Sequence, residues 1–293
     1  MLLIGESLNV ISTKIGRAFK ERNPLPIQEE AKNQKELGMD FIDINLGPAR
    51  KGGPELMEWV VKTVQEVVDD VPLALDTSNI EAIEAGLAVC NGRPLINSIM
   101  CRPARYEKML PICAKYNARM IALLWGPHGM PRDEHERAEL AVELVYAANE
   151  AGIANEDIFI DGIVTPVNVQ QDQVYSLLQF MPMVQDLGEG LRSTCGLSNV
   201  SNGSPNHLRP IINRTYMVML EKNGLYSAIA DAYDKDLVDI ARGRRSDIVE
   251  IIGKVMDEEP IDMSSISKEL QDYVKTARIL LKKALYSDSW LEL

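Results

Sequence analysis

The chain has 293 residues, of which 46% are hydrophobic and 25% are charged, a composition typical of a globular protein with a sizeable core. Its net charge of −12 argues against nucleic acid as the main partner, because phosphate binding needs a basic surface. No apolar run approaches the ~20 residues that a membrane-spanning helix needs. The start, MLLIGESLN, lacks the basic segment of a secretory signal, so we expect a cytoplasmic protein.

Short apolar runs recur along the chain, and nearly all of them end on an acid or an amide. Such runs are typical of buried parallel strands. In chain order, the predicted strands span residues 2–6, 41–45, 72–76, 94–98, 119–125, 157–161, 193–199 and 226–231.

Segments with helical periodicity separate these strands. A proline opens the first predicted helix and Gly38 closes it, which is the usual punctuation of a helix. The predicted helices span residues 26–37, 54–68, 79–89, 104–116, 133–151, about 168–184, 209–223 and 235–241. Alternation of strand and helix indicates a parallel sheet, and eight such units favour a closed (β/α)₈ (TIM) barrel. A doubly wound nucleotide-binding fold is the competitor, but neither of its glycine-rich phosphate motifs occurs.

The tail of the chain departs from this alternation. A basic cluster, RGRR at 242–245, precedes an amphipathic run at 247–256, an acidic turn ending at Pro260 and a predicted helix from about 265 to 285. We therefore divide the chain into a barrel, 1–241, and a C-terminal helical segment, 242–293, that completes or flanks it. This segment either packs on the barrel wall, mediates self-association or forms a solvated pair of charged helices.

Polar residues at the carboxyl ends of the predicted strands are the candidate functional groups. In an α/β barrel these ends meet at one mouth, where such proteins keep their chemistry. The residues expected there are Glu6, Asn9, Asp43, Asn45, Asp76, Asn97, Ser98, Asp161, Ser198, Asn199 and Asp231. For any one of the acids, a hydrogen bond to a neighbouring loop amide is an equally good explanation. Together they suit a metal ion, acid–base chemistry or a ligand rich in N–H groups.

A metal site is weakly supported. The chain has three histidines, and none has a partner at helical ligand spacing; the four cysteines lack any C-x-x-C spacing. We expect no tightly bound metal and reduced, buried cysteines. A ligand with a 2-amino-4-oxopyrimidine edge, such as a pterin, fits better, because one carboxylate can accept its amine and ring N–H together.

Seven segments carry a more specific pattern. They are GESLN (5–9), IDINLGP (42–48), LALDTSN (73–79), LINSI (95–99), IDGIVTPVNVQQD (160–172), CGLSNVSNG (195–203) and RPIINRTY (209–216). As a set they resemble the pterin-binding methyltransferases, and most of all the methyltetrahydrofolate:corrinoid/iron–sulfur protein methyltransferases. YSDSW at 286–290 resembles the C-terminal end of that family.

The resemblance implies roles for individual residues. Asp76, Asn97 and Asp161 would hold the pyrimidine edge of the pterin, and Asn199 would be catalytic through a hydrogen bond to nitrogen 5, which carries the methyl group. The other residues implied near the folate are Ser198, Asn202 and Arg209 as further binding residues, with Glu6, Asn9, Asp43, Asn45 and Asp231 as supports behind them.

The resemblance also implies the reaction and the partners. A homodimer in anaerobic one-carbon metabolism would move a methyl group between nitrogen 5 of tetrahydrofolate and the cobalt of a corrinoid. No D-x-H-x-x-G motif of a cobalamin-binding module occurs, so the corrinoid would arrive on a separate protein. A dihydropteroate synthase-like pterin enzyme and a non-catalytic pterin-binding or corrinoid-docking protein are the alternatives. The sequence leaves the direction of transfer open.

Overall fold

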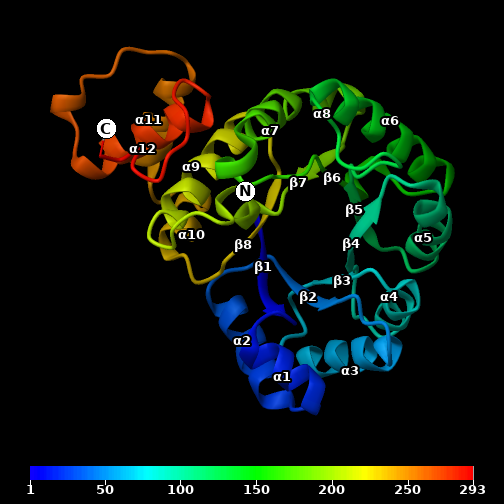
Figure 1. The fold of residues 1–293 in the computed structure, drawn as a ribbon. Helices are drawn as coiled ribbons and strands as arrows, with labels where there is room; N and C mark the ends of the chain where they lie inside the picture. Colours follow the sequence, from blue (N-terminus) through cyan, green and yellow to red (C-terminus); the bar gives the residue numbers. More distant parts are fainter. Residues whose placement is uncertain (293) are drawn as a thin grey trace.

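The computed structural model describes residues 1–292, and these residues form eight strands and twelve α-helices (Figure 1). The strands are β1 (Leu2–Asn9), β2 (Phe41–Gly47), β3 (Leu73–Thr77), β4 (Leu95–Met100), β5 (Arg119–Leu123), β6 (Ile158–Asp161), β7 (Arg192–Thr194) and β8 (Ser227–Ala230).

The strands form one parallel sheet that closes on itself. Their order is β7-β6-β5-β4-β3-β2-β1-β8, and each strand runs parallel to its neighbours. A parallel bridge between Gly196 and Ile229, with a hydrogen bond from Ile229 N to Cys195 O (2.8 Å), joins the two ends of the sheet. The predicted (β/α)₈ barrel with C-terminal helices is confirmed.

Helices cover the outside of this ring, as Figure 1 shows. Around the barrel they are α1 (Thr13–Glu21), α2 (Pro24–Glu36), α3 (Gly53–Gln65), α4 (Ile80–Leu87), α5 (Pro103–Lys115), α6 (Glu134–Glu150), α7 (Val167–Phe180), α8 (Met183–Leu187), α9 (Arg209–Lys222) and α10 (Lys235–Ala241). Short 3₁₀ turns complete the set: η1 (Asn155–Asp157), η2 (Leu197–Ser201) and η3 (Met263–Ser265).

The structure corrects the prediction at two helices. No element was predicted between residues 10 and 25, yet α1 lies there, capped by the Ser12 hydroxyl, which accepts a hydrogen bond from Ile15 N (3.4 Å). The single helix predicted at 168–184 is two helices: α7 ends at Phe180, and α8 begins at Met183 after the turn residues Met181 and Pro182. Ile15, Ala18 and Phe19 give α1 a clear helical period that the prediction missed, whereas the boundary between α7 and α8 has little periodic signal of its own.

The inside of the barrel is apolar at one end and polar at the other. A small cluster of side chains fills the floor: Ile4, Phe41, Ala74, Leu95, Ile121 and Phe159. Because side chains alternate along a strand, the residues two positions further on share the same inner face, one layer nearer the mouth. That layer is Glu6, Asp43, Asp76, Asn97, Leu123 and Asp161.

The C-terminal helices lie outside the ring, beside α9 (Figure 1). They are α11 (Ser246–Met256), which buries Ile248 and Ile252, and α12 (Lys268–Leu280), which buries Tyr273 and Val274. The last helix is shorter than the predicted 265–285, since Ser267 caps its start and the helix ends at Leu280. The tail therefore packs on the barrel wall. Whether it forms a unit separate from residues 1–241 stays a prediction.

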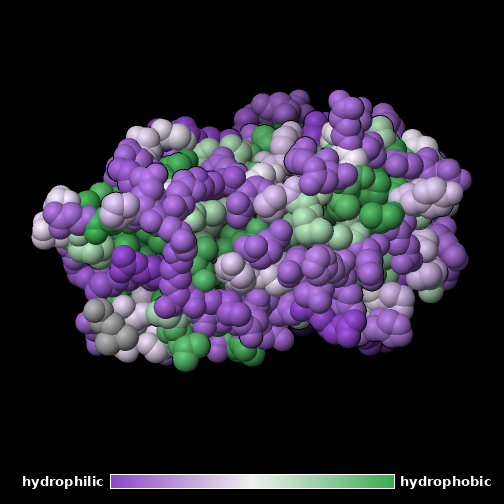
Figure 2. All heavy atoms as spheres, turned by 90° about the horizontal axis from the view of Figure 1, so that it is seen from above, coloured by the Kyte–Doolittle hydropathy of each residue, from purple (hydrophilic) through white to green (hydrophobic). Residues whose placement is uncertain are grey.

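The basic cluster at the start of the tail is engaged in ion pairs. Arg242 pairs with Asp40 at 2.7 Å, Arg244 with Asp239 at 2.6 Å, and Arg245 with Asp247 and Glu269. The face of the molecule shown in Figure 2 is mostly hydrophilic, with apolar side chains in scattered groups. No helix within residues 1–292 has the length and apolar character needed to cross a membrane.

Candidate active site

A ladder of paired polar side chains lies across β2, β3 and β4. Asn45, Asp76 and Asn97 are register partners on these neighbouring strands. Asn97 Nδ2 donates to Asp43 Oδ1 at 3.0 Å, and Asn45 Nδ2 donates to Asp76 Oδ2. Each of these two amides therefore holds the carboxylate of a nearby strand in place.

The carboxyl groups of this ladder are difficult to ionise. Asp43 is 2% exposed, and burial, followed by the neighbouring Asp76, raises its pKa well above the usual range. Burial raises the pKa of Asp76 to about 7. The two groups interact, so the pair carries fewer than two negative charges at neutral pH. It can both donate to and accept from a heterocycle.

Asp161 is the last residue of β6 and is 8% exposed. Its Oδ1 accepts a hydrogen bond from Ile163 N at 2.8 Å. Burial raises the pKa of Asp161 to about 6, whereas this hydrogen bond and the charge of Arg137 oppose the rise. Asp161 is therefore mostly ionised at neutral pH.

The segment that carries Ser198 and Asn199 is a turn and not the end of a strand. The strand predicted at 193–199 was wrong beyond Thr194, where β7 ends and η2 soon follows. The chain makes one bridge to β8 at Gly196 and then folds back, with Asn199 N donating to Gly196 O at 3.2 Å. A Cβ at Gly196 would lie 2.9 Å from Asn199 Nδ2, so the amide group of Asn199 lies directly over this glycine.

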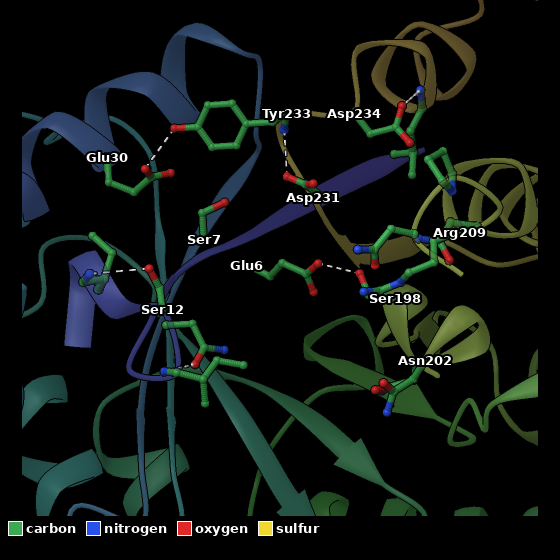
Figure 3. Close-up of a pocket in the computed structure, with 18 of the residues that line it drawn as sticks. Glu6, Ser7, Ser12, Glu30, Ser198, Asn202, Arg209, Asp231, Tyr233 and Asp234 are labelled. Carbon is green, nitrogen blue, oxygen red and sulfur yellow. Dashed lines mark hydrogen bonds between the residues drawn. The ribbon is translucent and has the colours of Figure 1, made fainter. Parts of the chain in front are cut away.

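Hydrogen bonds tie the η2 turn to β1 and α9. Ser198 Oγ donates to Glu6 Oε1, a contact that Figure 3 shows, and Ser201 Oγ donates to Ser198 O at 3.3 Å. Arg209 Nε, at the start of α9, donates to Ser201 Oγ at 3.2 Å. Burial raises the pKa of Glu6, and the hydrogen bond from Ser198 works against that rise. Glu6 and the turn thus hold each other in position.

A cavity of about 1030 Å³ opens beside this turn, between β1, η2, α9 and the loop after β8 (Figure 3). The predicted residues that line it are Glu6, Asn9, Ser198, Asn199, Asn202, Arg209 and Asp231. The others, Asp43, Asn45, Asp76, Asn97, Ser98 and Asp161, do not line it. The structure therefore divides most of the predicted set between a polar layer inside the barrel and a group along one side of its mouth, and Glu6 belongs to both.

Two of the predicted supports have a simple local role. Asn9 Oδ1 accepts from Ile11 N at 3.0 Å, and Asp231 Oδ1 accepts from Tyr233 N at 2.9 Å. These are loop hydrogen bonds within two residues, which explain both side chains without a ligand. Asn202 is exposed on the cavity wall, and its N–H donates to Asn199 O at 3.1 Å.

Sequence reasoning missed several residues that line the cavity. Tyr233 Oη donates to Glu30 Oε2 at 2.9 Å (Figure 3), and Lys14 lies on the unpredicted helix α1. Arg214 Nε and Nη2 both donate to Asp234, at 2.8 and 2.6 Å to Oδ1. Tyr233 and Asp234 follow the last strand by a few positions, which is the one signal that could have pointed to them.

Metal ligands are not gathered in the part of the chain that the structure describes. Within residues 1–292, no group of three or more histidine, cysteine, aspartate or glutamate side chains is arranged to hold a metal ion. The four cysteines are free, with Cys101, Cys113 and Cys195 buried and Cys90 partly buried.

Comparisons with known proteins agree with the geometry. Residues 5–229 match the family model described as pterin binding enzyme. The chain is 27% identical over 243 residues to a methylcorrinoid:tetrahydrofolate methyltransferase of Eubacterium limosum, covering 81% of this chain and 88% of that protein. It is 25% identical over 243 residues to a methionine synthase of Mycobacterium leprae, covering 79% of this chain but only 20% of that longer enzyme.

Solved structures with the same fold include dihydropteroate synthases. One from Xanthomonas albilineans, in complex with indole-2-carboxylic acid and 6-chloroguanine, superposes with a TM-score of 0.63 at 18% identity, covering 84% of this chain and 93% of that one. One from Thermus thermophilus has a TM-score of 0.61, also at 18% identity, covering 83% and 93%. At this identity the likeness concerns the fold. The family model, which spans most of the chain, shows that this protein belongs to the pterin binding enzymes.

Proposed function

We propose that this enzyme moves a methyl group between nitrogen 5 of tetrahydrofolate and the cobalt of a corrinoid held by a separate protein. The observation that carries the proposal is the position of Asn199, an exposed amide on the wall of a cavity at the mouth of an acid-lined barrel. The similarity to a methylcorrinoid:tetrahydrofolate methyltransferase over 88% of that protein supports it.

The polar layer inside the barrel suits the pyrimidine edge of a pterin. An ionised Asp161 accepts two parallel N–H donors, such as a ring N–H and its neighbouring amine. Asp76 and Asn97, register partners on β3 and β4, offer acceptor and donor atoms to the remaining ring atoms. We assign Asp76, Asn97 and Asp161 to pterin binding. Asn45 would hold Asp76 in place and Asp43 would hold Asn97, through the hydrogen bonds described above.

The η2 turn suits the reacting end of the substrate. When the methyl group leaves nitrogen 5 for cobalt, the electron pair of the broken N–C bond stays on nitrogen 5, which must gain a proton. The corrinoid supplies the nucleophile, cobalt in its Co(I) state. The amide of Asn199 can donate a hydrogen bond that strengthens as nitrogen 5 becomes more basic, so it stabilises the transition state more than the bound substrate.

The remaining mouth residues would shape the same turn. Ser198 ties it to Glu6, and Arg209 ties it to α9 through Ser201. Asn202 lines the cavity beyond Asn199. We propose that these residues contact the folate or hold the segment that does.

The proposal is tested with the purified chain, 5-methyltetrahydrofolate and free cob(I)alamin under anaerobic conditions. Loss of the cob(I)alamin absorption together with formation of tetrahydrofolate is the expected result, and methylcobalamin with tetrahydrofolate tests the reverse reaction. Binding of the folate without transfer would instead support a non-catalytic pterin-binding protein. Condensation of p-aminobenzoate with a dihydropterin diphosphate would support a dihydropteroate synthase.

The same proposal includes two partners. A corrinoid-carrying protein should bind the chain and accelerate transfer beyond the rate with free cobalamin. A second copy should give a homodimer, which sedimentation velocity would reveal as a species of twice the chain mass.

A further inference from the structure

Arg137 on α6 is a fully buried cation with no direct counter-ion. Its side chain is 0% exposed, and among the ion pairs within residues 1–292 none includes it. A buried guanidinium without an adjacent carboxylate is costly, because it loses its hydration without gaining an ionic partner. The hydrogen bonds that replace this hydration should therefore indicate the role of Arg137.

The guanidinium is held on three sides. Nε donates to Gly162 O at 2.7 Å, Nη1 to Ser176 Oγ at 2.8 Å and Nη2 to Gln173 Oε1 at 2.8 Å. Ser176 Oγ donates in turn to Glu134 Oε2 at 2.9 Å, and Gln173 Nε2 donates to Arg132 O at 2.6 Å. Two residues of α7 thus fix the orientation of Arg137, so that its Nε–H is directed at one backbone carbonyl.

That carbonyl belongs to the peptide unit that binds Asp161. Gly162 O and Ile163 N are the two ends of a single peptide group. The carbonyl end accepts from Arg137, and the N–H end donates to Asp161 Oδ1 at 2.8 Å. A cation at the carbonyl polarises the peptide and strengthens its N–H as a donor. Arg137 and Asp161 are therefore linked through one amide.

The turn around this peptide is tight. Ile163 has φ +69°, a left-handed conformation that is strained for a β-branched residue. A Cβ at Gly162 would lie 2.5 Å from Leu177 Cδ1, so the backbone is pressed against α7. A strained turn persists only where surrounding contacts determine it, and the bond from Arg137 is the cationic contact on this peptide.

We propose that Arg137 is a positioning residue for the pterin-binding carboxylate: through the Gly162–Ile163 peptide it holds Asp161 in place and in its ionised form. The inference rests on the proposed function in one respect, the assignment of Asp161 to pterin binding. It adds a residue on α6, outside the mouth of the barrel, that sets the strength of ligand binding without touching the ligand.

Several other charged and titratable groups lie near Asp161 and Arg137. Burial raises the pKa of Asp161 to about 6, and the Ile163 N–H and Arg137 lower it. The Cys195 thiol, just beyond β7, has its pKa raised by burial and by Asp161, so it stays neutral. Around Arg137 stand Tyr216 on α9, whose pKa burial raises, and Glu134 and Asp133 at the start of α6. Removing Arg137 should therefore raise the pKa of Asp161 further.

The test is Arg137→Met, a variant of similar length without charge. The pKa of Asp161 is measured in the ligand-free protein from the carboxyl ¹³C shift, assigned by its loss in Asp161→Asn. We expect it to rise by about one unit in Arg137→Met. The acid limb of the pH profile for 5-methyltetrahydrofolate binding should move upward by the same amount, so that affinity lost near neutral pH returns at higher pH.

Arg119→Met is the matched control. Arg119 is also partly buried, but it lies at the start of β5, over the ring of Phe41 (5.5 Å), at the opposite end of the barrel. The Arg119→Met substitution should leave the pKa of Asp161 unchanged. Should Arg137→Met fail to fold, Gln173→Ala keeps the charge but frees the guanidinium, and Arg137→Lys keeps a cation that cannot hold all three acceptors. Both should give a smaller shift in the same direction.

The outcomes separate the two proposals. Folded variants with lower thermal stability but an unchanged Asp161 pKa would overturn the role of Arg137, leaving it a purely structural residue. The carboxyl titration uses no ligand, so it remains decisive even if the wild-type chain binds no folate. Absence of folate binding by the wild-type chain would contradict the proposed function alone.

Discussion

At the scale of single residues, the amide of Asn199 and the carboxylate of Asp161 are held by backbone features. Gly196 leaves space for the Asn199 side chain, and the Ile163 N–H holds Asp161. The amide of Asn199 and the carboxylate of Asp161 can therefore both still bind a ligand. This arrangement predicts different consequences for the two residues, since one should meet the reacting atom and the other the distant edge of the pterin.

Asn199→Ala should slow methyl transfer much more than it weakens folate binding. If the amide acts mainly in the transition state, the rate should fall by about 10²-fold while the dissociation constant of 5-methyltetrahydrofolate changes little. Single-turnover rates with cob(I)alamin and equilibrium binding give the two numbers. An unchanged rate would remove Asn199 from the mechanism.

Asp161→Asn should weaken binding itself. The substitution keeps the size of the side chain but removes the charge. Hydrogen bonds to charged groups contribute about 1.5–3 kcal/mol, which corresponds to a loss of roughly 10- to 150-fold in affinity. Asp186→Asn is a suitable comparison, because Asp186 is exposed on α8 and does not line the cavity. Equal affinities for the wild type and Asp161→Asn would show that the pterin is oriented differently.

At the scale of elements, the η2 turn depends on the C-terminal strap, residues 281–291. Tyr286 Oη lies 2.8 Å from Ser204 Oγ and 2.9 Å from Asp288 Oδ1, and Ser204 N donates to Ser201 O at 3.0 Å. Gln171 Nε2, on α7, donates to Ala284 O at 2.8 Å. The strap thus connects α12 to the turn that carries Asn199.

Tyr286→Phe should loosen this turn without disturbing the packing of the ring on Trp290, whose centroid is 5.4 Å away. The loss of one hydrogen bond of about 0.5–1.5 kcal/mol should slow transfer by roughly 2- to 10-fold and leave folate affinity nearly unchanged. Hydrogen exchange at residues 196–204 should become faster. Tyr146→Phe, at an exposed site on α6, is the control and should change neither quantity.

At the scale of the whole molecule, the tail and the barrel share one hydrophobic core. Trp290 is 3% exposed, its Nε1 donates to Thr276 Oγ1 at 3.0 Å, and α12 contacts α9 of the barrel wall. A surface shared in this way favours cooperative unfolding of both parts over independent melting of the tail.

Trp290→Ala should lower the free energy of unfolding by about 3–5 kcal/mol, the range for truncation of a buried aromatic side chain. Denaturant unfolding followed by circular dichroism should show a single transition shifted to lower denaturant. Two transitions, with the barrel unaffected, would instead identify the segment from residue 242 onward as a separate unit. Trp125→Ala removes a tryptophan that is 38% exposed, so it should lower the free energy of unfolding much less.

The barrel and its polar strand ends could be predicted because their signals are local. A strand of five residues and the acid at its end occupy one stretch of sequence, so Asp76, Asn97 and Asp161 appear as candidates before any folding is considered. The pattern was misleading at Ser198 and Asn199, where a Ser-, Gly- and Asn-containing segment continued the polar strand-end pattern but folds as a turn after Thr194.

The sequence by itself determined the order of the strands, the helices that separate them apart from α1 and the division between α7 and α8, the polar strand ends and the family pattern, since periodicity and motif are properties of neighbouring residues. Only the tertiary structure decided which polar groups meet. Ser198 and Glu6 are 192 positions apart, Tyr286 and Ser204 are 82 apart, and Arg137 reaches Gly162 across 25 residues. Hydrogen bonds between residues so far apart in the sequence depend on the closure of the barrel and on the packing of α6, α7 and α12, which no local pattern encodes.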